Sequence, residues 1–147
     1  MKHPKYLDTD EATARRMANV KLKKGYAETL LAKGLWREGF RYRLNYKKLP
    51  GSPDIAILRH KIAVFVDGEF WHGYDWERKK GSLKRNKEYW VEKIEENISR
   101  DDRADKALIL MGWTPIHFWT KDILKNEADC IKAVKELTFD LQLQEYE

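Results

Sequence analysis

The stretch Pro53–His72 of this 147-residue chain reads PDIAILRHKIAVFVDGEFWH. Its two short apolar runs, Ile55–Leu58 and Ile62–Val66, are separated by the polar residues Arg59–Lys61. Two apolar runs around a short polar break are typical of a tight β-hairpin whose strands are both largely buried. We therefore expect the rest of the chain to be organised around this hairpin.

Acidic side chains stand at both ends of the hairpin. Asp54 opens the first strand and Asp67 closes the second, so folding brings the start of one strand beside the end of the other. Two carboxylates at such an edge suit a hard divalent cation, because Mg²⁺ prefers oxygen ligands and keeps several of its waters. Just downstream, Phe70, Trp71 and His72 are expected in an exposed loop, and adjacent exposed aromatics favour a binding surface.

Length and composition favour a single domain. With 147 residues and 42% hydrophobic content, the chain can bury one core. No run approaches the roughly 18 apolar residues that a membrane helix needs, and the first residues contain no apolar export signal. Cys130 is the single cysteine, which excludes an internal disulfide and a cysteine-rich zinc site. We expect a cytoplasmic protein.

The charge is distributed unevenly along the chain. Residues 1–61 carry 15 Lys and Arg against 6 Asp and Glu, a net charge of +9, whereas residues 62–147 have a net charge of −4. The basic half is therefore the predicted polyanion-binding surface. Six Trp favour nucleic acid, because flat aromatic faces stack on bases. The alternatives are ordinary solvated Lys and Arg, and Trp residues that belong to the core.

The first 24 residues are polar and basic and are predicted to form an arm, whereas residues 25–147 form the domain. Within the arm, a short helix is expected from Asp10 to Asn19. Arg15 and Arg16 are candidates to lie along a phosphate backbone, and a poorly ordered terminus is the alternative interpretation.

The domain is predicted to be an α/β sandwich with a central mixed sheet flanked by helices. Besides the hairpin, the expected elements are a helix from Tyr26 to Gly39, a strand Arg41–Tyr46, a helix Asn86–Met111, a strand Trp113–Trp119 and a helix from Asp122 to Tyr146. The long helix carries two stripes. The predicted core stripe contains Ile94, Ile98, Leu108 and Met111, and a polar and aromatic ridge contains Trp90, Asn97 and Asp101.

Four segments carry a specific combination of motifs. They read LPGSPDIAI (49–57), VFVDGEFWHG (64–73), EYWVEKIEENISRDDR (88–103) and LILMGWTPIHFW (108–119). Together they resemble the very short patch repair (Vsr) endonucleases, a branch of the PD-(D/E)XK restriction-endonuclease-like fold. The resemblance covers residues Lys24–Trp119, about two thirds of the chain.

The resemblance implies an active site and a role for each residue. The implied catalytic set is Glu28, Asp54, His72 and Asp101, with Asp67 at a further position that varies among relatives. Asp54 is expected to bind Mg²⁺ directly, assisted by the Val66 carbonyl and by waters that Glu28 holds. His72 is expected to act as the general base and Asp101 to orient it. Without the resemblance, the favoured explanation of Glu28 is that of an acidic residue in the first turn of a helix, where it complements the helix dipole.

The resemblance also implies a double-stranded DNA substrate, nicked next to a T:G mismatch. Aromatic side chains of the family wedge into the duplex, and unstacking is least costly where pairing is already poor. The expected DNA-binding residues are Phe70, Trp71, Trp90, Lys93, Asn97, Arg15 and Arg16. Such an enzyme is expected at the nucleoid. The sequence is compatible with a monomer and with partners from a repair or modification system, and it fixes neither.

One departure from the family concerns its structural zinc. Vsr enzymes hold this zinc with three cysteines and a histidine, and the matching positions here are Glu69, Tyr74, Trp76 and Lys121. We therefore expect no zinc and predict that Tyr74 and Trp76 pack in its place.

Three other functions stay open at this point. The first is a homing or restriction endonuclease that cuts paired DNA with the same core. The second is a non-catalytic protein that binds distorted DNA through the aromatic wedge. The third is an interaction module whose basic half binds an acidic protein.

Overall fold

The computed structural model of the chain describes residues 11–69, 74–81 and 87–145. Its elements are α1 (Glu11–Arg37), β1 (Arg43–Leu44), β2 (Ile55–Ile57), β3 (Ile62–Asp67), α2 (Trp76–Lys80), α3 (Lys87–Leu110), β4 (Thr114–Trp119), α4 (Thr120–Lys125) and α5 (Glu127–Glu145). The predicted mixed α/β architecture is confirmed.

The predicted hairpin, β2 and β3, forms the middle of the sheet. Within the described residues the strand order is β1-β2-β3-β4, with β3 and β4 parallel and the other neighbours antiparallel. Ile55 pairs with Val64, and Phe65 lies beside His117 of β4. Every residue of β2 and β3 is buried, because helices cover both faces. Their apolar runs are continuous for the same reason.

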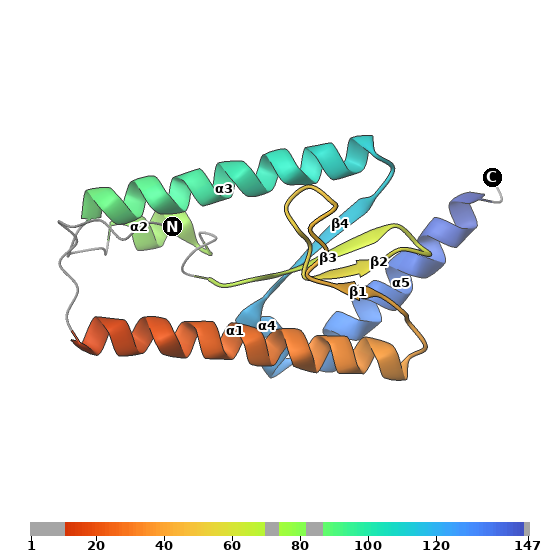
Figure 1. Cartoon of the computed structure of the whole chain (residues 1–147), viewed down its shortest axis with the longest axis horizontal. Coiled ribbons are helices and arrows are strands. Elements are labelled where there is room, and N and C mark those ends of the chain that lie inside the picture. Colours follow the sequence, from red (N-terminus) through yellow and green to blue (C-terminus); the bar gives the residue numbers. More distant parts are fainter. Residues whose placement is uncertain (1–10, 70–73, 82–86, 146–147) are drawn as a thin grey trace.

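Helices lie on both faces of the sheet (Figure 1). On one face, α1, α4 and α5 enclose a core cluster that contains Ala27, Leu31, Leu35, Ile55, Ile57, Ile62, Val64, Val66, Ile123, Cys130 and Val134. On the other face, a smaller cluster contains Leu49, Ala56, Ala63, Phe65 and Leu108 of α3. The alternation of side chains along β2 and β3 divides the two clusters.

Residues 11–37 form one uninterrupted helix, so the prediction of two separate helices was wrong. The segment between them, residues 20–25, contains three Lys and Leu22, which are good helix formers even without an apolar stripe. No described residue before Ala27 is buried, which explains why hydrophobic periodicity did not detect this half. The boundary drawn after residue 24 falls inside α1, and a DNA-binding role for the first 24 residues stays a prediction.

The C-terminal helix predicted as one element is two helices that meet at Asn126. The backbone of Asn126 leaves the helical region (φ −140°, ψ 61°), and its N–H donates to the Asp122 carbonyl at 2.8 Å.

Two further details of the fold differ from expectation. The loop expected at 73–81 contains the short helix α2, and Met111, expected in the core, is 50% exposed in the turn that ends α3.

The helices α1 and α3, of 27 and 24 residues, extend past the sheet at the same end of the molecule (Figure 1). The carboxyl ends of β3 and β4 point toward that end. None of the described helices combines the length and the apolar character that crossing a membrane requires.

Candidate active site

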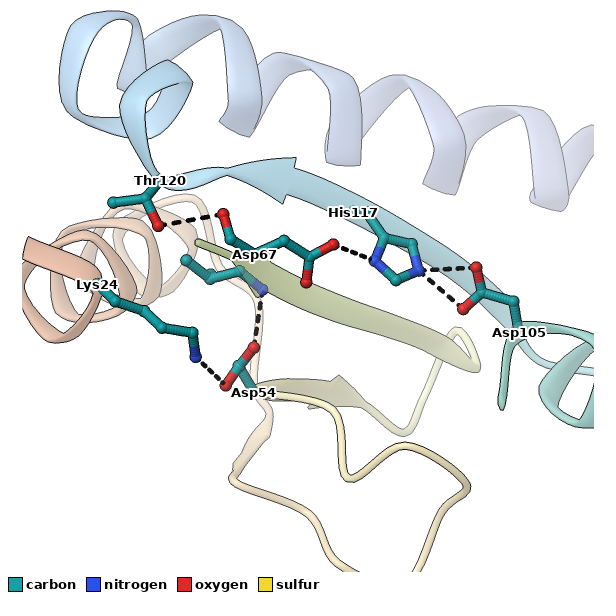
Figure 2. A network of polar contacts seen from close by, with 7 residues as sticks. Lys24, Asp54, Asp67, Asp105, His117 and Thr120 are labelled. Atoms are coloured by element: carbon teal, nitrogen blue, oxygen red, sulfur yellow. Dashed lines mark hydrogen bonds and ion pairs between the residues drawn. The ribbon is translucent and has the colours of Figure 1, made fainter. Parts of the chain in front are cut away.

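The Asp54 carboxylate is held at the open end of the hairpin. It precedes β2, and its Oδ2 accepts a hydrogen bond of 2.7 Å from the backbone N–H of Val66 in β3 (Figure 2). The side chain is only 16% exposed. The structure therefore joins Asp54 to the strand that the sequence analysis placed beside it.

Helix α1 adds Lys24 and Glu28 to the same place. The Lys24 ammonium lies 2.6 Å from Glu28 Oε1 and 3.5 Å from Asp54 Oδ1. The two residues are one helical turn apart and point the same way. Two carboxylates that are distant in the sequence thus share one cation, and the structure brings Glu28 and Asp54 together. Lys24 was not among the predicted site residues.

Burial controls the electrostatics of this cluster. Burial raises the pKa of Asp54, and the nearby Glu28 raises it too. The Lys24 charge and the Val66 hydrogen bond oppose this change, and the resulting pKa of Asp54 is about 6. Burial alone would lower the pKa of Lys24, but the charges and hydrogen bonds of Asp54 and Glu28 outweigh it and raise that pKa. The cluster therefore favours a positive charge between its carboxylates.

These residues fit a magnesium ion. Mg²⁺ is held by one or two carboxylates and keeps several waters, and the Lys24 ammonium already marks a cation position between Asp54 and Glu28. Within the described ranges, no three His, Cys, Asp or Glu side chains are arranged so that they could hold a metal by themselves. The donor set therefore suits a hydrated ion. The contribution of the Val66 carbonyl stays a prediction.

A second polar network surrounds His117 on β4, which the sequence analysis missed. His117 Nδ1 lies 2.7 Å from Asp67 Oδ2, and Nε2 lies 2.7 and 2.8 Å from the two carboxylate oxygens of Asp105 (Figure 2). Phe65 stacks on the imidazole with ring centroids 4.6 Å apart. The sequence led us to expect the carboxylates of Asp54 and Asp67 at the same edge; in the structure that of Asp67 contacts His117, whereas that of Asp54 contacts Lys24.

The two carboxylates keep His117 charged. Burial alone would lower the pKa of His117, but the hydrogen bond and charge of Asp67, followed by those of Asp105, raise it to about 9. An alternating strand pattern does place His117 on one face of β4. The sequence offers no comparable sign of its partners, which come from β3 and α3.

The long helix α3 carries its predicted site residues on its sheet-facing side. Asp101 precedes Asp105 by one turn and lies seven residues from both Ile94 and Leu108, which are buried. The predicted core stripe and polar ridge are therefore largely one face. The predicted DNA-binding residues on this helix are Trp90, Lys93 and Asn97, and each is half-buried.

The remaining predicted site residues fall into two groups. Arg15 and Arg16 are exposed in the first half of α1, and this half extends past the sheet (Figure 1). Phe70, Trp71 and His72 lie outside the described residues, so their roles as wedge and base stay predictions.

The positions that match the family's zinc ligands are linked by other contacts. The Lys121 backbone N–H donates to Glu69 Oε1 at 2.6 Å, and the Lys121 ammonium lies 3.4 Å from the centre of the Tyr74 ring. Tyr74 packs edge-on against Trp119. Trp76 donates instead to Glu95 at 3.1 Å. The predicted packing is thus correct for Tyr74, whereas Trp76 makes a polar contact.

Comparison with known proteins places this site in a family. Residues 7–78 match the family model described as DNA mismatch endonuclease Vsr. The type II nicking enzyme V.NmeDIP of Neisseria meningitidis serogroup C is 42% identical over 134 residues, which are 91% of this chain and 90% of that protein. The chain belongs to the Vsr family of DNA endonucleases.

Two further Vsr relatives support this assignment. The type II nicking enzyme V.HpaIIP of Haemophilus parainfluenzae is 52% identical over 99 residues, 67% of this chain and 70% of that protein. The DNA mismatch endonuclease Vsr of Escherichia coli (strain K12) is 32% identical over 128 residues, 86% of this chain and 81% of that protein. The family model spans Glu28, Asp54 and Asp67, and the resemblance expected from the motifs is confirmed.

Proposed function

We propose that this protein is a Mg²⁺-dependent endonuclease that nicks one strand of duplex DNA beside a T:G mismatch. The observation that supports it most directly is the convergence of Glu28 and Asp54 on one cation in a member of the Vsr family. The names of two relatives, a type II nicking enzyme and a DNA mismatch endonuclease, agree with it. The nucleoid is the corresponding proposed location.

In this proposal each residue of the cluster has a separate task. Asp54 binds the ion directly, and Glu28 orients waters around it. Mg²⁺, when bound, polarises the scissile phosphate and offsets charge on the leaving oxygen. His72 accepts a proton from the attacking water and Asp101 orients its ring, roles that rest on the resemblance of the motifs.

The proposed DNA surface is the end of the molecule at which α1 and α3 extend past the sheet. Arg15 and Arg16 on α1 are exposed there, and Lys93 and Asn97 of α3 are the proposed contacts on the opposite side. Phosphate contacts of this kind position a duplex without reading its sequence. Preference for a mismatch is assigned to the aromatic residues Phe70, Trp71 and Trp90, because poorly paired steps unstack at the lowest cost.

Strand-resolved cleavage tests the proposal. The purified protein is incubated with Mg²⁺ and with two duplexes that differ in one T:G pair, and each strand carries its own label. We expect one labelled strand to be cut, only in the mismatched duplex, and no cutting by Asp54→Ala although that variant still binds DNA. Cleavage by Asp54→Ala would contradict the assignment of the site.

Cutting of the perfectly paired duplex, without preference for the mismatch, would instead select a homing or restriction function with the same core. Absence of any Mg²⁺-dependent nicking would select a non-catalytic DNA-binding protein. Both outcomes would overturn the mismatch specificity.

The proposal includes no structural zinc. The side chains of Glu69, Tyr74, Trp76 and Lys121 do not form the cysteine and histidine set that a structural zinc site uses, and three of them are already linked to one another. Metal analysis of the purified protein, with less than one zinc per ten chains as the expected result, tests this part.

A further inference from the structure

His117 lies between two carboxylates and has no role in the proposed chemistry. A neutral imidazole has one N–H donor and one acceptor nitrogen, whereas an ionised carboxylate only accepts hydrogen bonds. Both ring nitrogens of His117 lie within 2.8 Å of carboxylate oxygens. Both nitrogens must therefore carry a proton, unless one of the carboxyl groups is protonated. The geometry describes an imidazolium held between Asp67 and Asp105.

The network anchors the end of β3 from two directions. The Asp67 side chain contacts His117, and the Asp67 carbonyl accepts a hydrogen bond of 3.2 Å from Thr120 Oγ1 (Figure 2). The preceding residue, Val66, donates its N–H to Asp54. A displacement of Asp67 would therefore be transmitted along one peptide unit to the carboxylate proposed to bind the ion.

The network also connects three elements. His117 belongs to β4, Asp67 to β3 and Asp105 to α3, one turn beyond Asp101. The Phe65 ring is nearly parallel to the imidazole, with an interplanar angle of 11°, and leaves the ring little freedom to turn. The side chains of His117 and Asp105 are 28% and 29% exposed, and that of Asp67 is 9% exposed. The ion pairs are thus shielded enough to hold one geometry.

We propose that His117 is a positioning residue of the endonuclease: as an imidazolium between Asp67 and Asp105, it fixes the end of β3, and with it Asp54, relative to Asp101 on α3. This inference rests on the proposed function. The raised pKa of His117 agrees with it, since the charged groups facing the ring are Asp67 from β3 and Asp105 from α3.

The test combines a ring titration with cleavage kinetics. NMR of the imidazole nitrogens in the full chain follows the protonation of His117 in wild type, in Asp105→Asn and in the control Asp102→Asn. Asp102 is exposed on the same helix and pairs with Lys106. We expect the His117 ring to titrate well above its ordinary pH in wild type and in the control, and clearly lower in Asp105→Asn.

The kinetic arm separates positioning from folding. In His117→Gln and Asp105→Asn, the single-turnover nicking rate at saturating protein is expected to fall by about tenfold or more, with DNA affinity within about twofold of wild type. Asp102→Asn should retain the wild-type rate. Circular dichroism at the assay temperature establishes that each variant is folded. A wild-type rate in His117→Gln, or a ring that titrates at its ordinary pH, would overturn the inference.

The two proposals fail in different ways. If wild type nicks no duplex, the proposed function is wrong and the positioning role is wrong with it. The ring titration would still decide whether His117 is an imidazolium between the two carboxylates.

Lys24 supports a second inference from independent contacts. Strand β3, which ends with Phe65, Val66 and Asp67, contains no lysine. The ammonium of Lys24 comes instead from α1 and lies between Glu28 and Asp54. We infer that Lys24 is a built-in counter-ion that competes with Mg²⁺ for these carboxylates and holds them together until the metal binds. This inference also rests on the proposed function.

Calorimetric titration with Ca²⁺ and with Mg²⁺ in the absence of DNA tests this competition without relying on cleavage. Lys24→Met is expected to bind either ion about tenfold more tightly, and to melt at a lower temperature in EDTA because Glu28 and Asp54 then repel each other. Lys33→Met removes the same charge from an exposed position of α1 and should bind as wild type does. Equal or weaker binding by Lys24→Met would overturn the inference, whereas failure of wild type to bind either ion would contradict the proposed metal site itself.

Discussion

The Asp54 carboxylate is mostly buried beside a second carboxylate, so its charge is costly when no metal is bound. Its pKa is raised from 3.8 to about 6, and the ionised form therefore destabilises the metal-free protein above about pH 6. An amide at this position keeps an oxygen for the Val66 N–H. We expect Asp54→Asn to increase the free energy of unfolding in EDTA at pH 7.5 by about 1 kcal/mol, and to reduce nicking by roughly 100-fold or more.

The sign of this effect can be checked by changing the pH. As the pH falls from 6 toward 4, Asp54 becomes protonated in the folded state and the advantage of the amide should shrink. Urea unfolding at both ends of this range measures it, with Asp102→Asn as an exposed control. A less stable Asp54→Asn at pH 7.5 would mean that the Lys24 ion pair outweighs the cost of burial.

His117 has the opposite consequence for stability, because its charge is paired on both sides. Its pKa rises from 6.5 to about 9 on folding. The stabilisation is therefore present in full below about pH 6.5 and is lost as the pH rises toward 9. We expect wild type to lose about 1–2 kcal/mol of unfolding free energy over this interval. In urea titrations His117→Gln should lose clearly less, and parallel losses would contradict a paired imidazolium.

The sequence identified Glu28 and Asp54 but not the cations between the carboxylates. Motif spacing locates residues that a reaction uses, and both acids belong to such motifs. Lys24 lies in a run of basic residues in which any member has the same chemistry, and His117 is an isolated histidine in a strand. Their partners are decided by how α1 and α3 pack on the sheet, which residue patterns alone do not specify.

At the scale of single elements, the loop before β2 packs against Phe65, the residue that stacks on His117. Gly51 has a φ of +77°, and a Cβ at this position would lie 3.0 Å from the Ala104 Cβ and 3.1 Å from the Phe65 ring. Phe65 in turn stacks on His117. We expect Gly51→Ala to destabilise the protein by about 2–3 kcal/mol through backbone strain and crowding and to slow nicking.

Gly112 provides a matched control for this change. It has a φ of +84°, yet no atom lies within 4 Å of its hypothetical Cβ. Gly112→Ala should therefore cost only the strain of the left-handed backbone, about 1 kcal/mol, and leave the nicking rate of the folded protein unchanged. Equal unfolding free energies of the two variants in urea would show that crowding at Phe65 is unimportant.

The elements differ in how far their sequences determine them. The β2–β3 hairpin and α3 were predicted because buried strands and an amphipathic helix leave clear patterns of apolar residues. The first half of α1 has no buried face, so its helical state depends on the propensity of its residues. The division between α4 and α5 depends on the backbone of a single residue, Asn126, and no composition signal accompanies it.

For the whole molecule, the structure shows where part of the positive charge of the first 61 residues lies. Part of it lies on the half of α1 that extends past the sheet, at the end toward which β3 and β4 point (Figure 1). A helix that buries no core residue along this half contributes little to folding there. Its exposed basic residues are therefore available to contact a phosphate backbone without loss of stability.

The salt dependence of DNA binding tests this assignment. Each phosphate contact that is lost reduces the slope of log affinity against log salt by about 0.9 for B-form DNA. We expect Arg15→Gln to weaken binding to matched and mismatched duplexes alike and to lower this slope by about 1, while the nicking rate at saturation stays unchanged. Lys132→Gln removes one exposed charge from α5 and should leave the slope as in wild type. If both variants change the slope equally, net charge rather than the extended half of α1 governs binding.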